Sequence, residues 1–333
     1  MAAAFGTVFM PEMAISWFDG SRWSSSEMVP SNSISLHPGA HVLHYSSTCF
    51  EGLKAFQHKD GSVHLFRMDK NIARLAQSSR LLYLPELNEK MVSDMIKETV
   101  ARFANEVPAP PGSLYIRPTH FGTEAAIGKA AVASSESCFF VLTSPVGDYF
   151  SGGDKMLRLL LEDEGMRCAP HMGMIKSGGN YASALGPISR ARDDVNADQI
   201  LFCPNGDVQE TGAANFLLID GNEIITKALD ESFLHGVTRD SLLTLAKDMG
   251  MTVSERNISV DELLERAAKP GCEAALSGTA AVLAPVGTFI YKGKEHTVGE
   301  GSIGKTTLKL RSTLNNIQWG HAEDTHGWLT RVN

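Results

Sequence analysis

The sequence predicts a two-lobed protein of mixed α and β structure. The first observation is length, because 333 residues exceed what one hydrophobic core usually organises. The second is the alternation of short β-rich runs with amphipathic helical runs. The third is the segment at residues 145–153 (PVGDYFSGG), whose glycines and proline break both regular structures. We therefore expect a smaller α+β lobe over residues 1–144, an interdomain loop over 145–153 and a larger lobe over 154–333.

The N-terminal lobe is expected to contain a β-hairpin and two further buried strands. Residues 48–56 and 63–66 are rich in β-forming side chains, with the turn residues Lys59-Asp60-Gly61 between them. Residues 113–119 and 138–143 have the apolar character of buried strands.

Two helices are expected between these strands. Asp69 is placed to cap the first, since Ile72, Leu75 and Ala76 follow it at helical spacing. Residues 88–103 repeat the pattern. Helices packed on a sheet give this lobe its α+β class.

The C-terminal lobe is expected to hold a meander or barrel-like sheet and at least one helix. The turns Asn205-Gly206 and Asp220-Gly221 separate short β-rich runs. These runs are residues 199–203, 208–210, 215–219 and 223–226. Residues 238–249 follow as a helix, with Thr238 as its cap and Gly250 as its stop.

Composition excludes several classes of partner. The net charge of −8, with no cluster of lysine or arginine, argues against nucleic acid, which requires a dense basic face. No apolar run reaches membrane-spanning length, so no membrane partner is expected. Five scattered cysteines without a CxxC pair favour free thiols in a reducing compartment. Residues 1–20 lack the features of a targeting segment, so we expect a cytoplasmic protein.

Four features together indicate a cofactor that combines an aldehyde with a phosphate. Residues 176–181 (KSGGNY) place Lys176 beside two glycines, and a partly desolvated lysine near other cations becomes a Schiff-base nucleophile. Residues 236–239 (GVTR) open a helix, where free N–H groups suit a phosphate. Residues 277–281 (SGTAA) form a small-residue loop with further donors. Glu210 ends a strand and could pair with a protonated pyridine nitrogen.

Each feature alone has an ordinary alternative. Lys176 could be a surface lysine beside a turn, and Thr238 an ordinary helix cap. The 277–281 loop could be only a turn, and Glu210 a solvated strand end. The interpretation therefore depends on the four features occurring together.

Two other groups of residues are given no role. His37, His41 and His44 have a spacing that could align metal ligands on a helix, but Pro38-Gly39 argues against a helix through them. The acidic run at residues 162–164 is typical of a solvated face. We expect no metal site.

Six motifs in order resemble the branched-chain aminotransferases of fold type IV, which use pyridoxal 5'-phosphate (PLP). They are residues 44–46 (HYS), 50–56 (FEGLKAF), 115–118 (YIRP), 176–181 (KSGGNY), 236–239 (GVTR) and 277–281 (SGTAA). The resemblance runs from about Trp17 to Trp328, and residues 115–118 with 144–147 (SPVG) look like the eukaryotic-type branch. It implies the two-domain PLP fold type IV, with the Schiff-base lysine in the larger C-terminal lobe.

The resemblance also implies a role for each cofactor-binding residue. Lys176 would be the catalytic Schiff-base lysine, Tyr181 would bond the cofactor phenolate, and Glu210 would pair with the pyridine nitrogen. The phosphate would be held by Arg74, Val237, Thr238 and Thr279.

The substrate site is implied in the same way. Tyr115, with Gly278 and Ala280 of the 278–280 loop, would take the α-carboxylate, and Arg117 would read a glutamate γ-carboxylate. The walls of the side-chain pocket would be Tyr45, Phe50, Val146 and Tyr149. Some of these would come from the partner subunit of a homodimer.

The implied activity is reversible ping-pong transfer of the amino group of leucine, isoleucine or valine to 2-oxoglutarate, giving L-glutamate. Lys176 would be the general base and Glu210 would keep the ring nitrogen protonated. Alternatives with the same fold are a D-amino-acid aminotransferase, an aminodeoxychorismate lyase or a non-catalytic PLP-binding protein. The chain departs from some eukaryotic-type members at Ala281 and Ala284, where those carry a CxxC thiol pair.

Overall fold

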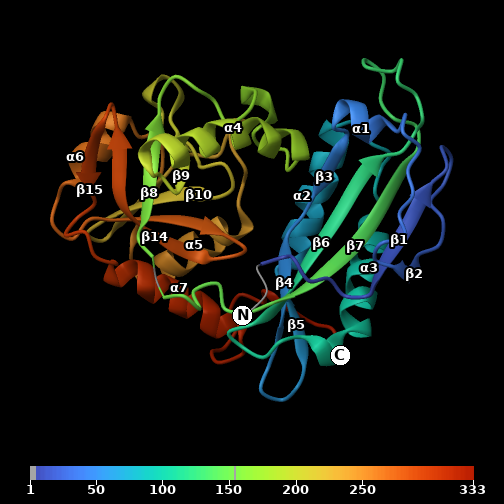
Figure 1. Ribbon diagram of the computed structural model, residues 1–333. Coiled ribbons are helices and arrows are strands. Elements are labelled where there is room, and N and C mark those ends of the chain that lie inside the picture. Colours follow the sequence, from blue (N-terminus) through green and yellow to red (C-terminus); the bar gives the residue numbers. More distant parts are fainter. Residues whose placement is uncertain (1–4, 154) are drawn as a thin grey trace. The chain divides into compact units, whose positions relative to one another are not determined.

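The computed structural model describes residues 5–153 and 155–333 (Figure 1). These residues form two compact units. Unit 1 contains the described residues up to Ser151, together with Ile175–Gly178 and Ile317–Asn333. Unit 2 contains the described residues of 152–174 and 179–316. Asp154, the expected first residue of the larger lobe, lies outside the described residues.

The units do not correspond to a single cut in the chain, because two segments pair with residues distant in sequence. The segment Ile175–Gly178 groups with unit 1, where Ser177 bridges Cys49 and the Phe50 N–H donates to the Lys176 carbonyl. The last strand, β16, pairs with β5. Lys176, expected in the C-terminal lobe, therefore lies in unit 1, and the two units are nearly equal in length.

Unit 1 is built on a mainly antiparallel sheet in the order β16-β5-β4-β6-β7-β1-β2, with β3 also paired to β6. Its strands are β1 Glu12–Phe18, β2 Glu27–Pro30, β3 Thr48–Phe50, β4 Leu53–Gln57, β5 Val63–Phe66, β6 Ser113–Gly122, β7 Ser137–Val146 and β16 Leu329–Arg331. Its helices are α1 His41–Tyr45, α2 Met68–Leu81, α3 Glu89–Arg102 and the 3₁₀ turn Ala104–Glu106. The apolar faces of α2 and α3 share one buried core with the sheet, which confirms the α+β class.

The predicted elements of unit 1 are of the right type, but the start of α2 and the ends of β6 and β7 differ from the prediction. The predicted hairpin is β4 and β5, with Gly61 at a left-handed φ of 82° in the turn. Arg67, and not Asp69, is the N-cap of α2, so Asp69 lies in the first turn. The strands β6 and β7 are longer than predicted because they pair along their whole length, to Ser113 opposite Val146. The irregular stretch after β7 therefore begins two residues later than the predicted loop.

Unit 2 contains a second sheet in the order β12-β11-β10-β13-β14-β8-β9, with β15 also paired to β14. Its strands are β8 Leu157–Glu162, β9 Gln199–Phe202, β10 Asn215–Asp220, β11 Glu223–Thr226, β12 Thr252–Glu255, β13 Glu273–Gly278, β14 Val282–Tyr291 and β15 Lys294–Thr297. The helices are α4 Gly178–Val195, α5 Val237–Asp248, α6 Val260–Ala267, α7 Lys305–Gln318 and the 3₁₀ turns Pro170–Met172 and Pro204–Gly206. The first residue of α4 and the last two of α7 group with unit 1.

Two predictions for unit 2 are wrong in detail. Residues 208–210 make no regular strand, because Glu210 forms only an isolated bridge to Asn215. Thr238 does not cap α5; the N-cap is Gly236, in an extended conformation. Gly250 follows the helix at a φ of 77°, as expected of a residue that ends it. None of the described helices has the length and apolar content needed to cross a membrane.

Candidate active site

The backbone of Lys176 is held on both sides by other parts of unit 1. The Phe50 N–H donates to the Lys176 carbonyl at 3.0 Å, and the Lys176 N–H donates to Ser78 Oγ at 3.2 Å. Its Nζ lies 5.0 Å from the centroid of the Phe50 ring. The backbone of Lys176 is therefore held in place by hydrogen bonds, and its amine is partly shielded from solvent. A surface lysine beside a turn would have neither property.

A buried carboxylate lies next to this segment. Glu51 is 1% exposed, and its two oxygens accept from Arg74 Nε at 2.6 Å and Arg74 Nη2 at 2.8 Å. Asn71 Nδ2 also donates to it at 2.8 Å. Burial by itself raises the pKa of Glu51, but the charges of Arg74 and Lys176 and the Asn71 amide together bring it below its usual range. Glu51 thus orients the guanidinium of Arg74, a residue expected at a phosphate.

A chain of buried hydrogen bonds runs behind β3. Cys49 Sγ lies 3.3 Å from Ser79 Oγ, Ser79 Oγ lies 3.0 Å from His120 Nδ1, and His120 Nε2 lies 2.9 Å from Ser137 Oγ. Burial lowers the pKa of His120 to about 3, so its ring is neutral near pH 7. The chain joins β3, α2, β6 and β7, and it ties the strand that bonds Lys176 to the helix that carries Ser78.

Tyr115 and Arg117 form a pair on β6, as their sequence spacing on one strand face requires. Arg117 Nη2 donates to the Tyr115 hydroxyl at 2.8 Å, and the guanidinium carbon lies 4.6 Å from the Phe50 ring centroid. A Cβ at Gly52 would lie 2.2 Å from the Tyr115 hydroxyl oxygen, so only glycine fits there. Arg117 Nε is buried without a hydrogen-bond partner in the described residues. The guanidinium therefore retains capacity to bind an anion.

The three other residues predicted to wall the substrate pocket have different surroundings. The Tyr45 hydroxyl donates to the Ile127 carbonyl, and the Tyr149 ring packs edge-on against Phe150 at 5.1 Å. Tyr149 is 54% exposed, whereas Val146 is buried at the end of β7. These interactions do not involve Lys176 or Arg117, so their predicted role remains a prediction.

In unit 2, Glu210 is buried and accepts from three surrounding donors. Arg167 Nη1 lies 3.0 Å from Oε1, the Leu234 N–H donates to Oε1 at 2.9 Å, and Asn215 Nδ2 donates to Oε2 at 3.1 Å. Glu210 is 2% exposed, so the solvated strand end that the sequence left open is wrong.

Arg167 is a residue that the sequence did not single out. It is 3% exposed, and its guanidinium carbon lies 5.4 Å from the centroid of the Tyr181 ring. Burial by itself lowers the pKa of Arg167, but Glu210, Tyr181 and Cys168 raise it overall. Arg167 thus contacts both Glu210 and Tyr181, two residues that are expected to bind the cofactor. The only sequence signal for Arg167 is that a buried Glu210 requires a cationic partner.

The N-terminus of α5 adjoins the same carboxylate. Asn215 Nδ2 also donates to the Leu234 carbonyl at 2.8 Å, and a Cβ at Gly236 would lie 2.0 Å from Asn215 Oδ1. Val237 and Thr238 follow in the first turn, with Thr238 buried.

The 277–281 loop begins beside Asn215. In the β10–β13 pairing Ser277 lies opposite Asn215, and Ser277 Oγ is buried without a hydrogen-bond partner in the described residues. Gly278 ends β13, and Thr279 and Ala280 form the turn into β14. An unpaired hydroxyl in a loop of small residues, near a helix N-terminus, suits an anionic oxygen.

The histidines set aside from the sequence are engaged in structural contacts. A short helix, α1, includes His41 and His44 but begins after Pro38-Gly39, so it does not include His37. His41 Nδ1 lies 2.8 Å from Ser47 Oγ, and His44 Nε2 lies 2.9 Å from the Pro38 carbonyl oxygen. In residues 5–153 and 155–333, no group of three potential ligands is placed to hold a metal.

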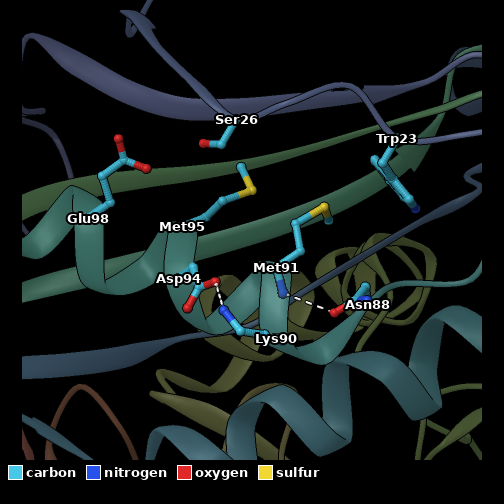
Figure 2. A pocket seen from close by; sticks show the side chains of 8 residues that line it. All are labelled: Trp23, Ser26, Asn88, Lys90, Met91, Asp94, Met95 and Glu98. Atoms are coloured by element: carbon cyan, nitrogen blue, oxygen red, sulfur yellow. Dashed lines mark hydrogen bonds and ion pairs between the residues drawn. The ribbon is translucent and has the colours of Figure 1, made fainter.

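A separate pocket of about 410 Å³ lies in unit 1 between α3 and the chain before β2 (Figure 2). Figure 2 shows Met91 and Met95 projecting from α3 toward the segment that carries Trp23 and Ser26, and Lys90 and Asp94 of the same helix form an ion pair of 2.5 Å. None of the site residues predicted from the sequence lines it.

Comparison with known proteins identifies the family. The model described as amino-transferase class IV matches residues 48–288. A probable branched-chain-amino-acid aminotransferase of Streptomyces coelicolor is 40% identical, over 98% of this chain and 91% of the relative. A branched-chain-amino-acid aminotransferase of Mycolicibacterium smegmatis is 38% identical, over 99% of this chain and 92% of the relative.

Solved structures with a similar fold are also branched-chain amino acid aminotransferases. The T.th. branched-chain amino acid aminotransferase with pyridoxamine 5'-phosphate has a TM-score of 0.82 at 25% identity, covering 98% of this chain and all of that chain. The Escherichia coli branched-chain amino acid aminotransferase has a TM-score of 0.78 at 26% identity, covering 96% of this chain and 99% of that one. This chain belongs to the class IV aminotransferase family.

Proposed function

We propose that this chain is a branched-chain L-amino-acid aminotransferase that uses PLP and exchanges the amino group between leucine, isoleucine or valine and 2-oxoglutarate. The observation that carries the proposal is the Phe50 ring, whose centroid lies 5.0 Å from the Lys176 amine and 4.6 Å from the Arg117 guanidinium carbon. A reactive amine and a carboxylate-binding group beside one aromatic surface suit a substrate that is part acid and part hydrocarbon. Full-length similarity to enzymes named for this activity supports the choice.

The residues present fit the cofactor in charge and in hydrogen bonding. Ser277 supplies a buried hydroxyl without a partner in the described residues, and α5 begins with a glycine cap. A buried Glu210 that is paired with Arg167 suits a protonated pyridine nitrogen. The residues that would hold the phosphate are Arg74, Val237, Thr238 and Thr279.

When bound, PLP supplies an electron sink for the bonds around the substrate α-carbon. Lys176 would be its attachment point, and the released amine would take the proton from the substrate Cα. Tyr181 would donate to the ring phenolate oxygen, and Glu210 would hold the proton on the ring nitrogen. Lys176 serves both half-reactions, so one product leaves before the second substrate binds.

The substrate would be oriented by groups at both ends. Tyr115, Gly278 and Ala280 would bind the α-carboxylate, and Arg117 the second carboxylate of glutamate or 2-oxoglutarate. The walls for the aliphatic side chain would be Tyr45, Phe50, Val146 and Tyr149, with some from the second subunit of a homodimer. We place the enzyme in the cytoplasm, since its five cysteines form no disulfide.

The first test is amine transfer by the purified protein. With L-leucine and 2-oxoglutarate, we expect L-glutamate and 4-methyl-2-oxopentanoate in equal amounts, measured by chromatography. Isoleucine and valine should also react, since one methylene changes binding by only about 1–3 kcal/mol. Activity with D-alanine alone, or pyruvate release from aminodeoxychorismate, would instead identify one of the other enzymes of this fold.

The visible spectrum tests the lysine. Addition of L-leucine should bleach the cofactor band of the wild type and of a Lys59→Ala control, since Lys59 is exposed on the hairpin turn. The Lys176→Ala variant should not bleach at a comparable rate. A colourless wild-type protein that borohydride cannot label would contradict the proposed function.

A further inference from the structure

Lys54 lies on the same face of the unit 1 sheet as Tyr115 and Arg117. In the antiparallel pairing of β4 with β6, Lys54 is directly opposite Tyr115, and Arg117 is two residues further along β6. Directly opposed residues share a face, with Cβ atoms about 5 Å apart. The alternate residues of both strands enter the hydrophobic core on the other face: Leu53, Ala55, Leu114 and Ile116. Two cationic side chains therefore flank Tyr115 on the face away from the core.

The mechanism described above gives Lys54 no task, although its position is unusual for a lysine. The residue is partly buried, and lysine is among the side chains least often shielded from water. Burial lowers the pKa of its amine to about 8, while Asp148 opposes that effect. In the described part of the chain, the charged and titratable groups placed near it include Asp148 after β7 and the Tyr115–Arg117 pair on β6. Lys54 is thus mostly charged at pH 7 and can lose its proton at little cost.

The neighbouring Tyr115 is fixed, so this face has a defined shape. Its hydroxyl lies over Gly52, two residues before Lys54, and accepts from Arg117. The Phe5 ring packs edge-on against the Tyr115 ring at 5.0 Å. A carboxylate that reaches Arg117 at its unpartnered Nε therefore approaches a strand pair in which Lys54 is the other cation.

We propose that Lys54 is a specificity-determining residue that binds, together with Arg117, the second carboxylate of the dicarboxylate substrate. The inference rests on the proposed function, which requires one pocket to accept both a dicarboxylate and an aliphatic side chain. A permanently charged lysine would disfavour the aliphatic side chain, because a charge held against a hydrocarbon is costly. A lysine that holds its proton loosely is charged beside a carboxylate and neutral beside a hydrocarbon.

Two measurable consequences follow. Dicarboxylate binding stabilises the charged amine, so it is accompanied by proton uptake at pH values near 8. Affinity for a dicarboxylate falls as the pH rises from 7 to 9, whereas affinity for an aliphatic monocarboxylate does not.

Calorimetric titration of the PLP-loaded enzyme with two unreactive acids tests these consequences. The probes are glutarate and 4-methylpentanoate, titrated at pH 7, 8 and 9 in buffers of different ionisation enthalpy. For the wild type we expect proton uptake with glutarate only. In Lys54→Met we expect the glutarate affinity to fall about tenfold or more, as when one charge-assisted hydrogen bond is lost. The 4-methylpentanoate affinity should change less than about threefold, and the proton uptake should vanish.

Two further variants complete the design. Lys54→Arg keeps a permanent cation, so it should restore glutarate binding and remove its pH dependence, and it also serves if Lys54→Met does not fold. Lys59→Met removes an exposed lysine from the same hairpin and should behave as the wild type. In kinetics, Lys54→Met should lower kcat/KM for 2-oxoglutarate far more than for 4-methyl-2-oxopentanoate.

Equal losses for both acids in Lys54→Met would overturn the inference, because they indicate a packing role. Unchanged glutarate binding, or proton uptake that persists in Lys54→Met, would also overturn it. These results are distinct from failure of the proposed function, in which the wild type itself would not transfer the amino group of L-leucine to 2-oxoglutarate.

Discussion

At the scale of single residues, each unit pairs one buried carboxylate with one arginine beside residues expected at the cofactor. In unit 1 the pair is Glu51 with Arg74, and in unit 2 it is Glu210 with Arg167. An isolated carboxylate at 1–2% exposure would be protonated or would unfold the site, so each requires its cation. The pairs fix side chains that would otherwise move, which is the usual requirement for a functional constellation.

The buried His120 gives the first stability prediction. Its folded pKa of about 3 lies below the unfolded value of 6.5, so the unfolded chain binds the extra proton between these pH values. The stabilising contribution of the neutral ring is complete above pH 6.5 and is lost as the pH falls toward 3. Between pH 7 and 5.5 this removes about 1 kcal/mol from the free energy of unfolding.

Urea unfolding followed by tryptophan fluorescence measures this loss, because all four tryptophans lie in unit 1. In His120→Gln the decrease between pH 7 and 5.5 should be smaller than in the wild type by about 1 kcal/mol. The exposed His37→Gln variant should keep the wild-type pH dependence. An identical pH dependence in wild type and His120→Gln would show that His120 does not titrate on unfolding.

At the scale of elements, the start of α5 depends on a close approach that only glycine permits. Gly236 has ordinary dihedral angles for any residue, at φ −70° and ψ 127°, so its requirement is steric and not conformational. An added Cβ would lie 2.0 Å from Asn215 Oδ1, and the same amide bonds Glu210 and the Leu234 carbonyl. The Asn215 side chain of β10 therefore contacts both the start of α5 and the buried Glu210 carboxylate, so the position of each depends on the others.

Gly236→Ala should displace the Asn215 amide and destabilise unit 2 by about 1–3 kcal/mol, the usual cost of overpacking with a broken buried hydrogen bond. Thermal unfolding measured by calorimetry should show the loss. Gly128→Ala is the matched control, because no heavy atom lies within 4 Å of the added Cβ. That variant should stay within about 0.5 kcal/mol of the wild type. Equal melting temperatures for the two variants would contradict the proposed role of the close approach.

At the scale of the whole molecule, the chain leaves unit 1 after Ser151 and returns to it twice. One return is the Lys176 segment, and the other is the C-terminal stretch that ends in β16. The Val332 N–H donates to the Val63 carbonyl at 2.9 Å, and the Val63 N–H donates to Asn333 Oδ1 at 2.7 Å. Strand β16 covers the edge of β5, which would otherwise expose unpaired backbone groups.

Deletion of residues 329–333 should therefore loosen unit 1 selectively. Amide hydrogen exchange over β5 should accelerate by about tenfold or more, since its outer neighbour is lost. Exchange over β10 and β13 of unit 2 serves as the internal control and should be unchanged. Acceleration of equal size in both units would show that β16 stabilises the molecule as a whole.

The sequence by itself determined the family and the type of most elements that it predicted. Local signals were sufficient for the hairpin at β4 and β5 and the Gly250 stop of α5, because turn and cap preferences act within a few residues. Ordered motifs were sufficient for the family, confirmed by a model match over residues 48–288.

Tertiary structure alone decided the partners of the buried charges and the grouping of the chain. Nothing local pairs Glu51 with Arg74, Glu210 with Arg167, or Ser177 with Cys49. Lys176 was predicted in the C-terminal lobe because it follows the loop in sequence, but its backbone hydrogen bonds are made by β3 and α2. Burial and long-range pairing depend on which segments meet in space. Secondary-structure propensity and residue spacing carry information only about residues that are close in the sequence.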